Sequence, residues 1–287
     1  MSELPVVPAA RPIAPAKILW GVPFGRSVDP IVVKAFIRMA MGTDPADVVN
    51  LAADSGDVER LLKLVAATYA KDPDAITKDV VQSLIRLIVG GWSRTVEFVD
   101  VPYGATAAAR NWMASYLKER KDATHLFMCD DDQVPPPDII ARLLRWWQED
   151  NNKLVISAMN FRRTVPHDAL VVVENPDGTG GALVPPFPES LFLLNGVCAC
   201  GAMLIHREVV DRVPPPWFFV EPAADGISQT TEDYPFCRKV RRHGVGIWVD
   251  PNTVNPHLGL QLIDKTSLTT EILDMSKAQK SPAAMVQ

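Results

Sequence analysis

The chain has 287 residues, 47% of them hydrophobic and 22% charged, and its formal net charge at pH 7 is -5. This composition is typical of a soluble globular protein with a substantial core, and the acidic balance excludes a broad basic surface for binding nucleic acid. The 4 cysteines are too few and too scattered for a disulfide framework, and the first residues show no basic, apolar leader, so we expect a cytoplasmic protein. The longest uncharged run, residues 190–205, is too short and too polar for a transmembrane segment, which leaves open only a peripheral membrane contact.

The predicted elements alternate between strand and helix over the first half of the chain. Residues 1–16, rich in Pro and Ala, are expected to form an extended arm, followed by a strand at 17–22 and a helix at 29–41. Helix-period stretches then predict a helical insertion at 43–91. The elements expected after it are a strand at 94–102, a helix at 104–120, a strand at 124–129, a helix at 138–150 capped by Asp138, and a strand at 153–159.

The second half of the chain has an α+β pattern, with several short predicted strands and one clear helix that begins near Glu232. The alternation before it predicts an α/β fold with three layers, because strands that alternate with helices form a parallel sheet covered on both faces. We expect one main domain at 17–260, which includes the helical insertion, and a tail or lid at 261–287. In sheets of this kind, ligands bind at the carboxyl ends of the strands.

Asp130, Asp131 and Asp132 directly follow the predicted strand at 124–129, and three prolines lie just beyond them. Adjacent carboxylates repel one another, and they cost free energy when they are partly buried without a cation. Oxygen ligands of this kind suit Mg²⁺ or Mn²⁺, whose remaining positions are commonly filled by phosphate oxygens and water. The sequence therefore allows two interpretations, a metal site for a nucleoside diphosphate or a solvated acidic turn.

Three further features could complete such a site, although each also has a purely structural explanation. Glu232 and Asp233 open a predicted helix, where acidic residues also stabilise the helix dipole. His257 lies in a turn bounded by Pro and Gly, in which an imidazole can ligate a metal or hydrogen-bond to the backbone. Arg110, in the helix before the aspartates, can reach a phosphate or pair with a surface carboxylate.

The order of these segments resembles the GT-A fold glycosyltransferases, close to the family 2 group. The segments are VPFG, AAARN, LFMCDDDQVPPPDII, GVCACGAMLIHREVV and TEDYPFCRKVRRHGVGIWVDPNTVNPHLG. The resemblance covers residues 17–259 apart from the insertion, and it implies a Rossmann-like, three-layer sandwich with a mixed central sheet. It also implies a metal-dependent enzyme that moves a sugar from a nucleoside-diphosphate sugar, a UDP- or GDP-sugar, to the hydroxyl of an unknown acceptor.

The same resemblance implies a role for each candidate residue. Asp130, Asp132 and His257 would hold Mn²⁺ or Mg²⁺. The nucleotide sugar would contact Pro23, Phe24, Asp100, Arg110, Asp130 and Asp131. Asp233 would act as the base of an inverting enzyme, with Glu232 as the second candidate. A retaining enzyme needs no such base, and the sequence leaves the stereochemistry open.

Three other functions are alternatives to glycosyl transfer. A nucleotidyltransferase that makes sugar nucleotides shares the α/β layout and a metal, but it is expected to have a Gly-rich phosphate loop, to which GVPFGRSVDP is a poor match. A phosphohydrolase with an aspartyl nucleophile also has Asp at a strand end, but prolines follow here. The third alternative is a non-catalytic protein that binds nucleotide and metal.

Overall fold

The computed structural model describes residues 16–22, 67, 71, 96–99, 101, 105–175, 179–222, 230–259 and 262–263. Residues 1–15 of the predicted amino-terminal arm, the helix at 29–41 and almost all of the insertion and of the carboxyl-terminal tail lie outside these residues. The same is true of Pro23, Phe24 and Asp100. What the sequence predicts for these segments stays a prediction.

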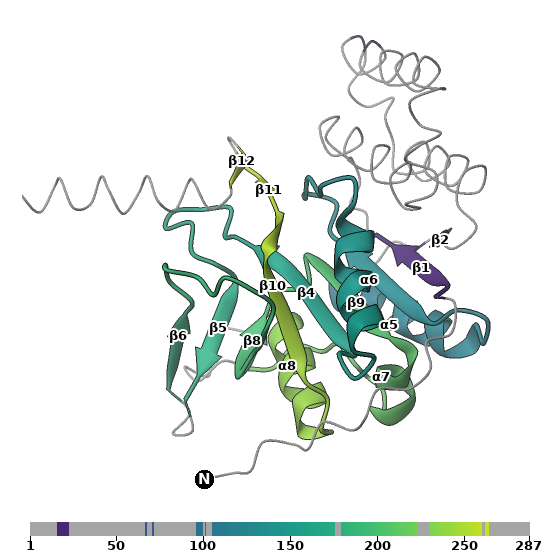
Figure 1. Ribbon diagram of the computed structural model, residues 1–287. Helices are drawn as coiled ribbons and strands as arrows, with labels where there is room; N and C mark the ends of the chain where they lie inside the picture. The colour runs from purple at the N-terminus through teal and green to yellow at the C-terminus, as the bar shows by residue number, and fades with distance from the viewer. Residues whose placement is uncertain are drawn as a thin grey trace, which may run out of the picture.

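A seven-stranded mixed sheet forms the centre of the described structure, with the strand order β2-β1-β3-β9-β4-β10-β7 (Figure 1). The strands are β1 (Ile18–Gly21), β2 (Val96–Val99), β3 (His125–Cys129), β4 (Val155–Asn160), β7 (Phe192–Leu193), β9 (Ala202–His206) and β10 (Ile247–Asn255). β1 pairs in parallel with β2 and β3, and β4 pairs in parallel with β10. β9 lies antiparallel between β3 and β4, so the alternation of the first half predicts the parallel strands but not this inserted one.

Helices cover both faces of this sheet. They are α5 (Thr106–Glu119), α6 (Ile139–Glu149), α7 (Arg207–Arg212) and α8 (Asp233–Arg242). Because side chains alternate along a strand, Leu126 and Met128 of β3 belong to the core cluster that includes residues of α5, α7 and α8. Phe127 and Cys129 belong to the cluster that includes residues of α6. The expected α/β three-layer sandwich with a mixed central sheet is therefore confirmed.

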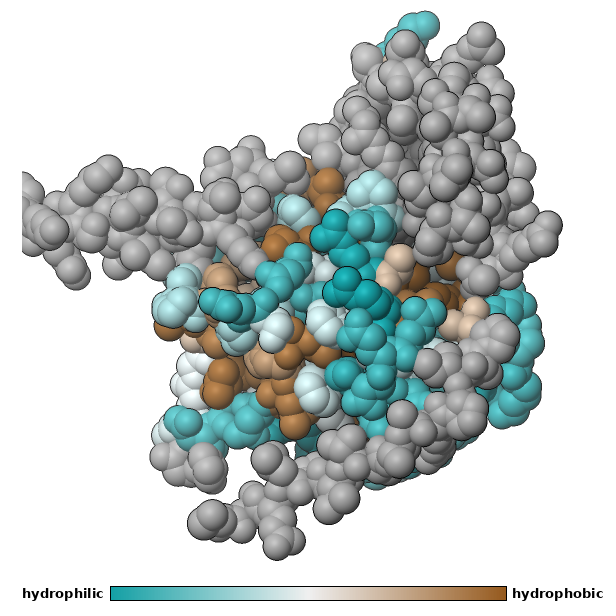
Figure 2. Space-filling view, viewed as in Figure 1, coloured by the Kyte–Doolittle hydropathy of each residue, from teal (hydrophilic) through white to brown (hydrophobic). Residues whose placement is uncertain are grey.

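Helix α6 is amphipathic and contributes to both core and surface. Ile139 and Leu143 are buried against the sheet, whereas Arg142 and Arg145 are exposed on an outer face that is hydrophilic in Figure 2. Asp138 precedes the helix as predicted, but its side chain makes no capping hydrogen bond. Its carboxylate instead pairs with Arg142 at 2.8 Å, one helical turn further on.

Two smaller sheets flank the central one. They consist of β5 (Val171–Glu174), β6 (Gly180–Ala182) and β8 (Gly196–Cys198), and of β11 (His257–Leu258) and β12 (Leu262–Ile263). β8 packs against α8, where the Cys237 thiol donates to the Cys198 carbonyl at 3.4 Å. Across the described ranges, every helix is too short or too polar to cross a membrane.

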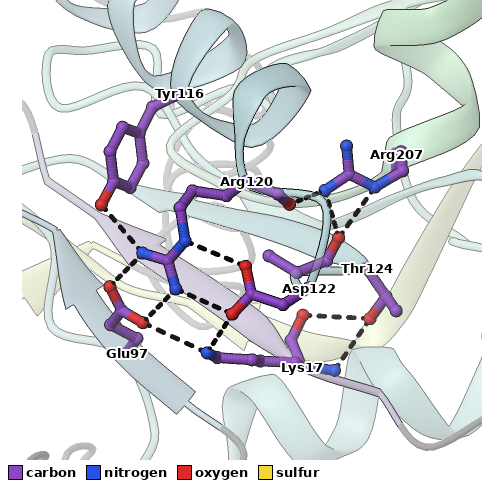
Figure 3. A network of polar contacts seen from close by, with 8 residues as sticks. Lys17, Glu97, Tyr116, Arg120, Asp122, Thr124 and Arg207 are labelled. Carbon is purple, nitrogen blue, oxygen red and sulfur yellow. Dashed lines mark hydrogen bonds and ion pairs between the residues drawn. The ribbon is translucent and has the colours of Figure 1, made fainter.

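A polar network closes the edge of the sheet at which β1 and β3 begin (Figure 3). The Arg120 guanidinium donates to Glu97 at 2.5 and 2.7 Å and to Asp122 at 2.9 Å. The backbone amide of Lys17 donates to the Thr124 hydroxyl at 2.9 Å, which ties the start of β1 to the start of β3. Because these ion pairs are largely in contact with solvent, each contributes little to stability, and we interpret this edge as structural.

Candidate active site at the carboxyl edge of the sheet

The strands β1, β3, β4 and β10 run in the same direction and therefore end at one edge of the sheet. The segments at this edge carry residues 130–132 after β3, residues 161–163 after β4 and His257, the first residue of β11, after β10. The strand order also reverses here, since β2 lies on one side of β1 and β3 on the other. Ligands of open α/β sheets bind outside the carboxyl ends of the strands at such a switch point. The aspartates follow β3, which is next to β1 in the sheet. They therefore lie close to the switch point at which a ligand is expected.

Backbone pairing brings His257 beside Asp132. The amide of Leu258 donates to the Asp132 carbonyl at 2.8 Å, and the amide of Val134 donates to the Pro256 carbonyl at 2.8 Å. Two segments that are distant in the sequence therefore run side by side just beyond the ends of β3 and β10. This pairing fixes the position of the His257 side chain relative to that of Asp132.

The His257 ring is held between the Asp132 carboxylate and the backbone carbonyl of Phe161. Its Nδ1 lies 2.9 Å from the Phe161 oxygen, and its Nε2 lies 2.9 Å from Asp132 Oδ2. Because a carbonyl oxygen only accepts, Nδ1 carries the hydrogen, and Nε2 of the neutral ring turns its lone pair toward the carboxylate. Two electron-rich atoms at this distance need a cation, which is either a proton on Nε2 or a shared metal ion.

Asp132 and His257 are two side chains of this edge that could hold a metal ion together, because a carboxylate oxygen and a ring nitrogen lie 2.9 Å apart. Within the described ranges, no group of three or more His, Cys, Asp and Glu side chains is placed to hold a metal. Further ligands would therefore be phosphate oxygens and water, as is common for Mg²⁺.

The charges around Asp132 favour its ionised form. Its Oδ2 also accepts from Arg163 Nη1 at 3.2 Å. Burial opposes the charge on Asp132, but the hydrogen bond with His257 and the charges of His257 and Arg163 hold the pKa of its carboxyl below its usual value. Burial likewise opposes the charge on His257, while the hydrogen bond with Asp132 and the carboxylate charge raise the pKa of the imidazole above its usual value.

Arg110 joins the aspartate turn to the start of α8. Its side chain is 2% exposed, and its Nη2 donates to Asp130 Oδ1 at 2.7 Å. Its Nη1 lies 3.0 Å from Glu232 Oε1 and also contacts the Asp233 carboxylate. The guanidinium carbon lies 5.9 Å from the centre of the Phe218 ring. Burial opposes the charge on Arg110, but the charges of Asp130 and Glu232 raise the pKa of the guanidinium above its usual value.

Asp130 and Arg110 contact each other in the structure. Arg110 is also buried among the carboxylates of Glu232 and Asp233, so we interpret it as a residue that positions these three acidic side chains. The contacts of Asp130 with a metal ion and of Arg110 with a nucleotide sugar stay predictions. Burial raises the pKa of the Asp130 carboxyl, an effect that the charge of Arg110 partly offsets.

Most of the predicted site residues lie at this one edge of the sheet. They form two groups joined by the aspartate turn, Asp132 with His257, and Arg110 with Asp130, Glu232 and Asp233. Asp131 lies in the same turn and is partly exposed. Pro23, Phe24 and Asp100 lie outside the described residues, and their roles remain untested.

Two site residues were missed by the reasoning from sequence. Phe161 acts through its backbone carbonyl, which no side-chain pattern indicates. Arg163 contacts Asp132 from the loop after β4, and the signal for it was available, because the predicted strand at 153–159 ends at the same edge as the aspartate strand. A charged residue just beyond that strand was therefore a candidate.

Comparison with protein-family models and with curated proteins finds no match to this sequence. Among solved structures, the chain resembles A197 from STIV, with 14% sequence identity, a TM-score of 0.48 and coverage of 84% of this chain and 85% of that one. It also resembles UDP-glucose pyrophosphorylase complexed with UDP-glucose, with 8% identity, a TM-score of 0.46 and coverage of 91% and 99%. A third similar structure is CMP:2-keto-3-deoxy-manno-octonic acid synthetase complexed with CTP, with 10% identity, a TM-score of 0.40 and coverage of 92% and 100%.

The last two names denote sugar-nucleotide nucleotidyltransferases, the first of the alternatives to glycosyl transfer, and none of the three names a glycosyltransferase. At these identities and TM-scores the likeness transfers no activity to this chain. The function has to follow from the residues of the site.

Proposed function

We propose that the chain is a metal-dependent transferase that takes a sugar from a nucleoside-diphosphate sugar and passes it to an acceptor hydroxyl. The observation that carries the proposal is the pair formed by Asp132 and His257, next to the Glu232 and Asp233 carboxylates that share Arg110. The first group suits a cation and a diphosphate, and the second offers a proton acceptor. The resemblance of the sequence to GT-A glycosyltransferases supports the same function.

Each group has a defined task in this reaction. Asp132 and His257 would hold Mn²⁺ or Mg²⁺, and the ion would supply positive charge for a departing diphosphate. Asp233 is assigned as the base for the acceptor hydroxyl, with Glu232 as the second candidate. Both carboxylates contact Arg110, and a base has to be ionised to accept a proton. Arg163, exposed beside Asp132, is suited to contact phosphate oxygens.

The charge of this edge favours glycosyl transfer over nucleotidyl transfer. A nucleotidyltransferase brings together a nucleoside triphosphate and a sugar phosphate, and two polyanions need several cationic groups around them. Residues 130–132, 232 and 233 bring five carboxylates to the described edge, where Arg110 is engaged by three of them and Arg163 contacts Asp132. A neutral hydroxyl acceptor, which needs a base, suits this charge better.

A ligand screen tests the proposal and separates it from the alternatives. In thermal-shift measurements with UDP-, GDP- and dTDP-sugars, the true donor should raise Tm in the presence of Mn²⁺, because a ligand at 100 times its Kd stabilises the native state by about 2.7 kcal/mol. That donor, incubated with a panel of hydroxyl acceptors, should release a nucleoside diphosphate. Pyrophosphate release from a nucleoside triphosphate and a sugar phosphate would establish nucleotidyl transfer instead, and binding without turnover in both assays would favour a non-catalytic protein.

Asp233→Asn should lower kcat by about 10²- to 10⁴-fold with little change in the KM of the donor, because it removes the base but keeps the shape of the side chain. Glu232→Gln is the matched control, since both carboxylates contact the same Arg110 Nη1. We expect a smaller loss in that control. Equal losses in the two variants would mean that the pair serves to hold Arg110 and that Asp233 is not the base.

A further inference from the structure

A buried network of side-chain amides lies directly beneath the Asp132 and His257 pair. The Nδ2 of Asn255 contacts Gln133 Oε1 at 2.9 Å, Asn160 Oδ1 at 2.9 Å and the Gly201 carbonyl at 3.2 Å. All three amide residues are at most 2% exposed. The network therefore links the ends of β3, β4 and β10 to the start of β9, the four strands that meet beneath the site.

Each amide lies within two residues of His257 or of a residue that contacts its ring. Gln133 directly follows Asp132, and Asn160 directly precedes Phe161, whose carbonyl accepts from the ring. Asn255 is separated from His257 by one proline. A shift of Gln133 would thus move Asp132, and a shift of Asn160 would move the Phe161 carbonyl. A shift of Asn255 would move His257 itself.

The chemistry of the network is specific to an amide at position 255. All three partners of Nδ2 are oxygen atoms, so only a group that carries hydrogens can sit among them. Gly201 is also needed, because a Cβ there would lie 2.8 Å from Asn160 Oδ1 and 3.1 Å from Gln133 Nε2. The Gly201 carbonyl also accepts from the Asp130 amide at 3.0 Å, which connects the network to the aspartate turn.

One acceptor of the network has no protein partner among the residues that the structure describes. Asn255 Oδ1 is buried and has no hydrogen-bond partner within the described ranges, and an unpaired buried acceptor costs free energy. Apolar side chains of similar volume would fill the same space without this cost. Keeping three amides here is therefore consistent with a need for defined geometry at the site above them.

We propose that Asn255, Gln133 and Asn160 are positioning residues that orient the His257 ring toward Asp132, so that its Nε2 is presented to a divalent cation. The inference rests on the proposed function in so far as the cation is concerned. The orientation of the ring is a property of the protein alone, and it can be measured without metal, nucleotide or turnover.

The test is the tautomer of His257, read from the nitrogen shifts of ¹⁵N-histidine-labelled protein at alkaline pH, where the ring is neutral. The chain has 5 histidines, and His257→Gln identifies the signal. In the wild type Nδ1 should carry the hydrogen, because it donates to Phe161. Asn255→Leu should replace this pattern by that of a ring exchanging between tautomers, and it should weaken Mn²⁺ binding, followed by EPR, by about 10- to 100-fold.

Thr253→Val is the matched control. Thr253 is equally buried on β10, and its hydroxyl donates to Asp250 Oδ2 at 2.7 Å, in a hydrogen-bonded group that does not include the amide network. It should leave the His257 tautomer and the Mn²⁺ affinity unchanged. If Asn255→Leu does not fold, Gln133→Met removes one member of the network and carries the same expectation.

The outcomes separate this inference from the proposed function. An unchanged His257 signal in folded Asn255→Leu or Gln133→Met would overturn the positioning role, whatever the metal does. A changed signal in a protein that binds no Mn²⁺ would support the positioning role and contradict the metal site. If the His257 signal also changed to that of an exchanging ring in Thr253→Val, the effect would be a general response to disrupting β10. This result would also overturn the inference.

Discussion

Arg110→Met should lower the free energy of unfolding by about 3–5 kcal/mol, the usual result of removing one partner from a buried ion pair. The variant would leave the carboxylates of Asp130, Glu232 and Asp233 close together without the guanidinium that they share. Their mutual repulsion and poor solvation are the reason for the size of the effect. Urea unfolding at neutral pH, followed by circular dichroism, measures it.

Arg120→Met is the control for this experiment. Arg120 also contacts two carboxylates, those of Glu97 and Asp122, but its side chain is 26% exposed whereas that of Arg110 is 2% exposed. Solvent screens these ion pairs, so the control should lose less than about 1 kcal/mol. Similar losses in the two variants would show that burial of Arg110 is not the reason for its contribution to the free energy of unfolding.

Asp132→Asn should reduce metal-dependent turnover by at least about 100-fold and leave the fold intact. The amide keeps the shape of the carboxylate but removes the negative charge, on which affinity for a hard divalent cation depends. Mn²⁺ titration followed by EPR measures the loss of metal binding. Turnover of the donor found in the ligand screen measures the loss of activity separately. Activity that is unchanged over the same range of Mn²⁺ would exclude Asp132 as a ligand.

Asp138→Asn is the matched control, because it changes the same chemical group a few residues further along the chain. The side chain of Asp138 is 48% exposed just before α6, where its carboxylate pairs with Arg142. This variant should bind Mn²⁺ and turn over donor as the wild type does. If both variants lose activity to the same degree, the loss reflects the general acidity of the segment and not ligation by Asp132.

The elements of the central sheet were largely predictable from the sequence. The strands at 17–22, 124–129 and 153–159 appear in the structure as Ile18–Gly21, His125–Cys129 and Val155–Asn160, within two residues at each end. Each is a short apolar run, and such runs carry their signal within a few residues. β9 was less predictable as part of this sheet, because it reverses direction between β3 and β4, and a local pattern does not encode the neighbour of a strand.

The candidate site was predictable as a set of residues but not as an arrangement. Asp132 and His257 were named from their positions in the sequence, yet their contact depends on backbone pairing across 125 residues. Arg110 contacts both Asp130 and Asp233 in the structure, and Asp233 is 123 residues away from it in the sequence. The helix pattern around Arg110 gave no indication that its side chain would be buried among carboxylates.

Local patterns in the sequence predicted the α/β fold class, most strands of the central sheet, the helices α5, α6 and α8 and the candidate acidic residues after β3, but not the short helix α7. The contacts of Asp132 with His257 and of Asp130 with Arg110, and the meeting of Gln133, Asn160 and Asn255, became known from the tertiary structure alone. The physical reason is that these contacts join chain segments brought together by the order and direction of strands. Hydrogen bonds between side chains are then selected by distances of a few tenths of an ångström, which no local pattern specifies.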